Sequence, residues 1–298
     1  MKKYLHLPII NLSSSAYLTL LTLIAPLINF LSGISIDLYA PSMPAIALHF
    51  HTTAIIVKNT VTISMIGLAL GAIVFGVLFD VVGRRSILLL TIFVYFIASC
   101  LIPFAASISQ LLLLRFIQGL VTGAMAVGSR ALAIDNFTGH RFFVVMVYTS
   151  VAYASGPVFG PFIGGYLQYH FGWRANFYAY AVVAALIAAL LFCFVKESLT
   201  EENKKDMWSA IFSYRIVLLH PIFFLAMVVL SFVIIEQLLY PTIGPFIVQN
   251  VLGYSAISYG NSALIVGIGY LIGSIFNRLL LPYISIKKLM SLGLILLV

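Results

Sequence analysis

The sequence predicts an all-α membrane protein, a bundle of membrane-spanning helices, and three observations lead to this fold class. Apolar residues fill 62% of its 298 positions and charged residues only 8%, whereas soluble chains have roughly 45–50% and about 25%. Eight apolar runs are long enough to cross the ~30 Å hydrocarbon core of a bilayer as helices. Basic residues are distributed very unevenly among the segments between these runs. Most of the molecular surface must therefore face lipid.

The predicted helices follow one another along the chain with short polar or Gly/Pro-containing segments between them. The longest polar stretch, residues 196–215, comes after the sixth run and predicts a linker. It separates a complete six-helix bundle over residues 1–195 from an incomplete second bundle over residues 216–298, with helices seven and eight and the start of a ninth. The eight apolar runs cover residues 16–38, 58–79, 86–105, 110–134, 142–167, 175–195, 218–240 and 256–279.

The basic residues predict the orientation of the chain in a plasma membrane, because cytoplasmic segments are enriched in Lys and Arg. With a cytoplasmic amino terminus, 13 of the 16 basic residues fall on the inner side, and the exceptions are Lys58, Arg115 and Arg174. The net charge of +8 is then a consequence of topology and does not indicate a nucleic-acid partner. The 13 inner residues are Lys2, Lys3, Arg84, Arg85, Arg130, Arg141, Lys196, Lys204, Lys205, Arg215, Arg278, Lys287 and Lys288.

The segment between the second and third runs contains a glycine, an acid four residues later, and then a Gly-Arg-Arg turn. An acid and an arginine at this spacing can form a charge-assisted latch between two helices. The alternative is a simple turn with basic residues anchoring the cytoplasmic side. Glycines along the second helix predict close approach of another helix. The residues of this pattern are Gly76, Asp80, Gly83, Arg84 and Arg85, with Gly67 and Gly71 before them.

The fourth run contains Arg115, followed by Gln118, Gly119 and Gly123. A cation within a membrane helix is costly and usually lines a cavity or pairs with an acid. Alternatively, Arg115 extends to the outer interface with its charged end in water. The residues themselves leave both possibilities open.

The fifth run contains two Gly-Pro pairs and a following Gly-Gly pair. Each proline removes a backbone hydrogen bond and can kink the helix, and the glycines form a flat face for tight packing. The residues are Gly156, Pro157, Gly160, Pro161, Gly164 and Gly165.

Two acids close to prolines are candidates for proton coupling. Asp37 precedes Pro41 at the end of the first run, and Glu236 precedes Pro241 at the end of the seventh. A carboxyl group in a low-dielectric setting can hold a proton near neutral pH, although either acid could instead contact water. A third acid, Asp135, is expected to be a solvated charge of an inner loop.

These motifs resemble those of the major facilitator superfamily, in its twelve-helix drug:proton antiporter branch of the bicyclomycin and multidrug-resistance type. The resemblance covers the whole chain, but Val81 stands where the family usually has a basic residue. It implies export of lipophilic small molecules in exchange for protons across the bacterial inner membrane. It further implies proton coupling by Asp37 with Arg115, a latch at Asp80 and Arg84, and a rocking surface on the fifth helix.

A membrane-embedded enzyme would instead need a cluster of catalytic His, Asp or Ser residues at the interface, and the sequence contains none. Cys100 and Cys193 lie inside apolar runs, so we expect no metal site, and we expect no cofactor.

The chain length predicts an incomplete transporter. Only residues 289–298 remain for a ninth helix, and these ten cover about 15 Å, half of the ~30 Å hydrocarbon core. We therefore expect the chain to be inactive by itself, with membrane lipids and a separate chain carrying the remaining helices as candidate partners. The alternative is a non-transporting remnant or a partner-dependent membrane protein.

Overall fold

The computed structural model describes residues 13–199 and 220–280, together with residues 282–285, 288, 289, 291, 293 and 295. All regular structure in these residues is helical. Eight helical segments of the described chain are long and apolar enough to span a bilayer, which confirms the prediction from the apolar runs. These segments are Ser14–His49, Ala54–Val82, Arg84–Phe104, Ile108–Asn136, Gly139–Phe171, Arg174–Phe194, Pro221–Val251 and Ala256–Gly273.

The individual elements give the bounds that are used below. The long helices are α1 Ser14–Asp37, α3 Ala54–Val82, α4 Arg84–Leu101, α5 Ile108–Asn136, α6 Gly139–Phe171, α7 Arg174–Phe194, α9 Pro221–Phe246 and α10 Ala256–Leu280. Short elements extend some of them: η1 Ala40–Ser42, α2 Met43–His49, η2 Ile102–Phe104 and the π-helical turn η4 Ile247–Val251.

Hydroxyl side chains cap the starts of three long helices. Ser13, Thr53 and Ser107 each accept a hydrogen bond from a backbone amide three residues further on. Such caps satisfy amides that a helix start otherwise leaves without a partner. The helix α4 differs, because Gly83 precedes it and can offer no capping side chain.

The first membrane span is longer than the run 16–38 predicts, because the chain remains largely helical to His49. Pro41 lies in the first turn of η1, and Pro44 lies in the first turn of α2. A proline is tolerated there, since the missing amide would have no helical acceptor. Asp37 consequently lies well inside the span, and not at its end.

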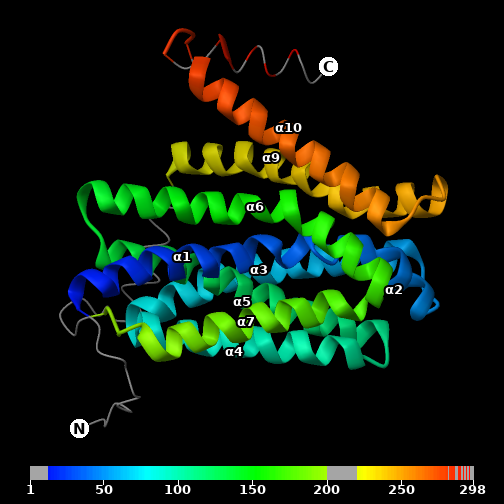
Figure 1. Cartoon of the computed structure of the whole chain (residues 1–298), viewed down its shortest axis with the longest axis horizontal. Coiled ribbons are helices and arrows are strands. Elements are labelled where there is room, and N and C mark those ends of the chain that lie inside the picture. The colour runs from blue at the N-terminus through cyan, green and yellow to red at the C-terminus, as the bar shows by residue number, and fades with distance from the viewer. Residues whose placement is uncertain are drawn as a thin grey trace.

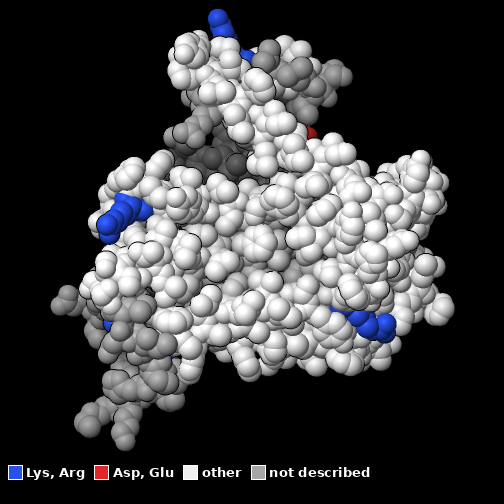
Figure 2. All heavy atoms as spheres, viewed as in Figure 1, with Lys and Arg blue, Asp and Glu red and all other residues white. Residues whose placement is uncertain are grey.

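The helices from α1 to α7 form one bundle whose long members run side by side (Figure 1). α3 packs on α5, α1 packs on α6, and α4 contacts both α5 and α7. α9 and α10 lie beyond α6, and α10 contacts the bundle mainly through that helix (Figure 1). On the face in Figure 2, basic side chains lie near the ends of the helices, with a broad and almost uncharged band between them. Such a band is what a lipid-facing surface requires.

The helix pair with the most extensive contact, α3 and α5, has small residues on both sides. Gly67 and Gly71 of α3 lie against the backbone of α5, while Gly119 and Gly123 of α5 lie against the backbone of α3. A side chain at any of these positions would collide with a main-chain atom of the facing helix. The prediction that another helix approaches the glycine face of the second membrane helix is confirmed.

Candidate functional site: a charged cluster and a buried polar centre

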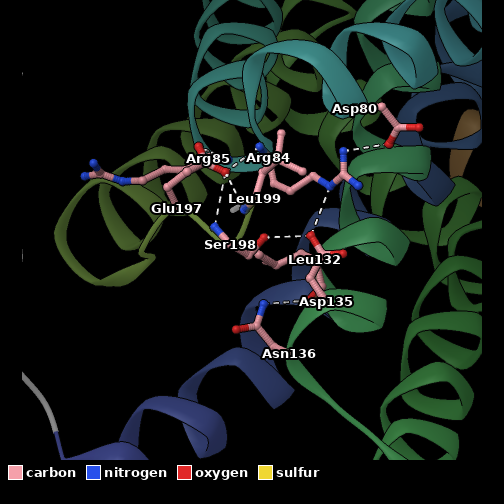
Figure 3. Close-up of polar contacts among 9 residues, drawn as sticks. All are labelled: Asp80, Arg84, Arg85, Leu132, Asp135, Asn136, Glu197, Ser198 and Leu199. Atoms are coloured by element: carbon pink, nitrogen blue, oxygen red, sulfur yellow. Dashed lines mark hydrogen bonds and ion pairs between the residues drawn. The ribbon is translucent and has the colours of Figure 1, made fainter. Parts of the chain in front are cut away.

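Arg84 occupies the middle of a charged cluster at one end of the bundle (Figure 3). Its Nη1 atom lies 2.8 Å from Oδ1 of Asp80, which is near the end of α3. Its Nε atom donates to Oδ2 of Asp135 at 3.0 Å. The Arg84 side chain is only 11% exposed, so one guanidinium group joins the acids of two helices in a largely buried setting.

Asp135 is not the solvated loop charge that the sequence suggests. It belongs to the last turn of α5, and its Oδ2 atom also accepts a hydrogen bond of 2.8 Å from the Ser198 hydroxyl. The sequence placed it near Arg130 and Arg141, but its partner is Arg84, 51 residues away. The packing of α4 on α5 brings the two residues together, and the sequence around Asp135 does not indicate this contact.

Glu197 is a second member of the cluster that sequence reasoning missed. Its Oε1 atom accepts from the backbone amide of Arg84 at 2.6 Å, and its Oε2 atom accepts from that of Arg85 at 3.1 Å. The carboxylate thus caps α4, and it also lies at the end of the helix that attracts negative charge. The missing cap at the start of α4 was the available signal, because those amides require an acceptor from elsewhere.

Gly83 makes this cap possible. Its φ angle of +132° lies where residues with a side chain are strained, and a Cβ atom there would lie 2.6 Å from Oε2 of Glu197. The Arg85 side chain extends away from Asp80 (Figure 3) and donates to the Phe192 carbonyl at 2.8 Å. The charged cluster therefore joins α3, α4, α5 and the segment that follows α7, and it consists of Asp80, Arg84, Arg85, Asp135 and Glu197.

Arg115 is the main residue of a second region, within the bundle. The side chain is 0% exposed, which excludes its extension to the outer interface. Its Nη1 atom donates to the Gln118 side chain at 2.9 Å and to the Ser35 carbonyl at 3.2 Å. Its guanidinium carbon lies 4.1 Å from the centroid of the Tyr39 ring, a favourable cation–π distance.

The charge of Arg115 has no acidic partner within the described part of the chain. The only ion pairs found among those residues are the two that Arg84 makes. The Nε and Nη2 atoms of Arg115 are buried without a hydrogen-bond acceptor. Buried polar atoms normally have partners, so this arginine is an unusual and costly feature of the bundle.

Hydroxyl and amide groups from three helices surround Arg115. Gln118 donates to Ser99 of α4 at 2.8 Å, and Ser35 of α1 lies 3.0 Å from the Tyr95 hydroxyl. We call this region the buried centre. Its members are Ser35, Tyr39, Tyr95, Ser99, Arg115 and Gln118.

Asp37 ends α1, two residues after Ser35, and its side chain is close to α6. The residue is 7% exposed, and a Cβ atom added at Gly160 would lie 3.0 Å from its Cβ atom. The carboxyl group accepts no hydrogen bond from the residues that the structure describes. It is a buried acid without a partner in this part of the chain, as Arg115 is a buried base without one.

The Gly-Pro and Gly-Gly pairs of the fifth apolar run lie in α6, and they contact two different neighbours. Gly156 packs against Gly33 of α1, and Gly164 packs against Leu38, the residue that caps the end of α1. Gly165 lies against Ala256 of α10 instead, and Pro161 is met by Gly260 of α10. Pro157 and Pro161 both lie inside one helix, which continues through them. One motif therefore forms a contact within the bundle and a contact with α10.

The family model of the Major Facilitator Superfamily matches residues 27–298 of this chain. The chain belongs to the major facilitator superfamily. This is a family of membrane transporters, and the matched region includes both the charged cluster and the buried centre.

Curated relatives of this superfamily member include drug-resistance proteins. A bicyclomycin resistance protein homolog of Haemophilus influenzae is 31% identical over 194 residues, which are 65% of this chain and 48% of the relative. Chloramphenicol resistance protein CraA of Acinetobacter baumannii is 26% identical over 273 residues, 90% of this chain and 65% of the relative. The chain thus spans about half the length of the Haemophilus relative.

Solved structures of the superfamily share the fold. A D-xylose–proton symporter superposes with a TM-score of 0.66 at 17% identity, covering 89% of this chain and 69% of the symporter. A bacterial homolog of the human lysosomal transporter Spinster, in an inward-facing and unoccupied conformation, also has a TM-score of 0.66, at 19% identity, covering 91% and 64%.

Glu236, the other acid singled out from the sequence, lies apart from the buried centre in this superfamily member. It is an exposed residue of α9 and lines a hollow of about 490 Å³ together with Tyr240, Gly244 and Val248. Around the charged cluster, Val81 is half-buried, and Asp135 and Glu197 supply contacts that the sequence motif alone did not include.

Proposed function

We propose that this chain forms the N-terminal half and part of the C-terminal half of a proton-coupled exporter of lipophilic, drug-like molecules that works by alternating access. Two relatives named for bicyclomycin and chloramphenicol resistance support the direction and substrate class. The proposed division is a bundle over residues 1–195, a linker over residues 196–215 and an incomplete bundle over residues 216–298. Residues 200–215 lie outside the described residues.

The observation that carries the proposal is the buried, unpartnered carboxyl group of Asp37. A carboxylate in a membrane span needs a partner, a proton or access to water. Asp37 has no hydrogen-bond donor in the described chain and lies beside Gly160 of α6. Binding and release of a proton is therefore the change that this group is best placed to make during transport.

Arg115 has the complementary role in this proposal. It is buried in the same bundle without an acid, and α1 links the two sites because the Ser35 carbonyl accepts from its guanidinium group. A fixed positive charge in a medium of low dielectric constant acts over longer distances than it would in water. It favours the ionised form of acids in the bundle, so it would bias proton release from Asp37.

The charged cluster would act on the conformational balance, away from the substrate. Its charges lie at the helix ends, whereas transporter substrates bind near the middle of the membrane. The α6 glycines would provide the surface on which α10 moves. With a cytoplasmic amino terminus, the cluster would lie on the cytoplasmic side. Single cysteines placed in the linker should then resist impermeant thiol reagents in intact cells, and ready labelling would contradict this orientation.

Replacement of Asp37 by asparagine tests the proposed function. The variant Asp37→Asn should abolish proton-driven efflux, because the amide cannot take up and release the proton. The measurement is efflux of lipophilic cations and neutral antibiotics from vesicles with an imposed pH gradient. It compares the chain itself with a chimera completed by the C-terminal helices of the Haemophilus relative. We expect efflux from the chimera only.

The matched control is Asp37→Glu, which keeps a carboxyl group at the same place and should retain part of the activity. Membrane levels of both variants must equal those of the unmodified protein. Undiminished proton coupling in Asp37→Asn would remove Asp37 from the mechanism. Efflux by the 298-residue chain alone would contradict the expected dependence on further helices.

A further inference from the structure

Tyr259 of α10 is a buried phenol without a hydrogen-bond partner. The residue is 0% exposed, and its hydroxyl group has neither a donor nor an acceptor in the described structure. A buried hydroxyl group that is left unpaired keeps the full cost of its desolvation. Such an atom in a native bundle requires an explanation, for example a partner that it meets in another conformation.

The neighbouring Tyr240 shows that the unpaired hydroxyl is specific to Tyr259. The two rings stack with centroids 5.6 Å apart, so both belong to the same contact between α9 and α10. The Tyr240 hydroxyl, however, lies 2.8 Å from Oγ of Ser262 and is therefore satisfied. The ring stack and the contact with Ser262 together account for Tyr240, whereas the hydroxyl group of Tyr259 has no partner.

Asp37 is a buried residue whose carboxyl group accepts no hydrogen bond in the described chain, and α6 brings it and Tyr259 to neighbouring positions. Asp37 lies against Gly160, and Gly260, the residue after Tyr259, lies against Pro161. The turn η1, which begins three residues after Asp37, also contacts α10 directly. Another tyrosine of the region, Tyr180, has already committed its hydroxyl to the carbonyls of Ile34 and Ser35.

The contact between α6 and α10 allows the two residues to approach each other. Small residues form it from both sides, with Gly165 against Ala256 and Gly267 against Val158. Beyond Gly267, a Cβ atom at Gly269 or Gly273 would meet open space, and α10 turns away from α6 (Figure 1). A helix held over half its length by small residues can shift without breaking interlocked side chains.

We propose that the Tyr259 hydroxyl is the hydrogen-bond donor for the Asp37 carboxyl group, and that movement of α10 along α6 makes and breaks this bond. The inference rests on the proposed function, in which Asp37 carries the proton. Tyr259 acts as a positioning residue, because it couples the state of the acid to the place of a helix outside the six-helix bundle. An ionised carboxylate accepts more strongly than a protonated acid, so the bond stabilises this arrangement of α10 most when Asp37 has released its proton.

Infrared difference spectroscopy of the purified chain in lipid nanodiscs tests the bond directly. The Asp37 carboxyl band is identified by its loss in Asp37→Asn. In Tyr259→Phe this band should shift toward the frequency of a carboxyl group without a hydrogen bond. The matched control Tyr240→Phe, which removes a hydroxyl from the same ring stack, should leave it unchanged. An unshifted band in Tyr259→Phe, or equal shifts in both variants, would overturn the proposal.

Cross-linking gives a second test that does not depend on the folding of Tyr259→Phe. With Cys100 and Cys193 replaced by serine, the pair Asp37→Cys and Tyr259→Cys should react efficiently with a short bifunctional thiol reagent. The control pair, Asp37→Cys with Tyr270→Cys on the exposed part of α10, should not. Equal yields would refute the juxtaposition. Neither measurement requires transport, so a failure of Asp37→Asn to affect efflux would remove the proposed function but leave the Asp37–Tyr259 bond testable.

Discussion

The charged cluster and the buried centre differ in whether their charges are paired. In the cluster, Arg84 lies between two acids, and Glu197 accepts from two backbone amides. In the buried centre, Arg115 has no acid and leaves two nitrogen atoms unpaired, although it is the more deeply buried of the two arginines. Asp37, close by on α1, has no hydrogen-bond donor in the described chain.

The difference separates charges that hold the structure together from charges that remain available for a reaction. In the charged cluster, Arg84 and its two acids are paired, although Nε of Arg85 has no hydrogen-bond partner. Removal of one paired member leaves the other buried with its full desolvation cost. An unpaired buried charge already bears that cost, so its removal need not destabilise the fold. We therefore expect substitutions in the charged cluster to lower mainly the stability, and substitutions in the buried centre to lower mainly the transport.

Replacement of Arg115 by methionine should have the largest effect on transport and the smallest on folding. The variant Arg115→Met keeps an apolar chain of similar length and removes the uncompensated charge. Proton-coupled efflux by the completed chimera should fall about 100-fold, the upper range of site-to-site coupling. The midpoint of unfolding in mixed micelles should stay the same or rise. A clear loss of stability together with normal efflux would show that Arg115 is structural.

Replacement of Glu197 by glutamine should reverse this pattern. The neutral side chain of Glu197→Gln can accept only one of the two amide hydrogen bonds and has no favourable charge at the start of α4. The free energy of unfolding should fall by about 1–2 kcal/mol, while equilibrium substrate binding stays unchanged. The matched control is Glu236→Gln on α9, which has no such contact and should not change the stability. Equal unfolding midpoints for both variants would exclude a capping role.

Replacement of Asp135 by asparagine should have a smaller effect than the loss of Glu197, because Arg84 would keep Asp80 as its partner. The side chain of Asp135 is 20% exposed, so the loss should be about 0.5–1 kcal/mol. Combination with Asp80→Asn should cost more than the sum of the single changes, because Arg84 then loses both acids. A strictly additive double-mutant cycle would indicate that Arg84 does not couple the two helices.

The membrane helices could be located from the sequence because each span is a local property. About 20 consecutive apolar residues satisfy their own backbone as a helix in lipid, whichever neighbours they have. The glycines of α3 likewise indicated a close helix neighbour without tertiary information. The first span was underestimated because Pro41 and Pro44 look like helix ends, although each lies in a first turn where a proline is tolerated.

The sequence by itself determined the fold class, the eight spans and the family motifs, since hydropathy and local spacing carry that information. Only the tertiary structure decided which charges are paired. Asp135 and Glu197 meet Arg84 from 51 and 113 residues away, and Arg115 proved to be buried where the sequence left two possibilities. Partners of this kind depend on which helix faces meet, and that arrangement is a property of the packed bundle that no single apolar run contains.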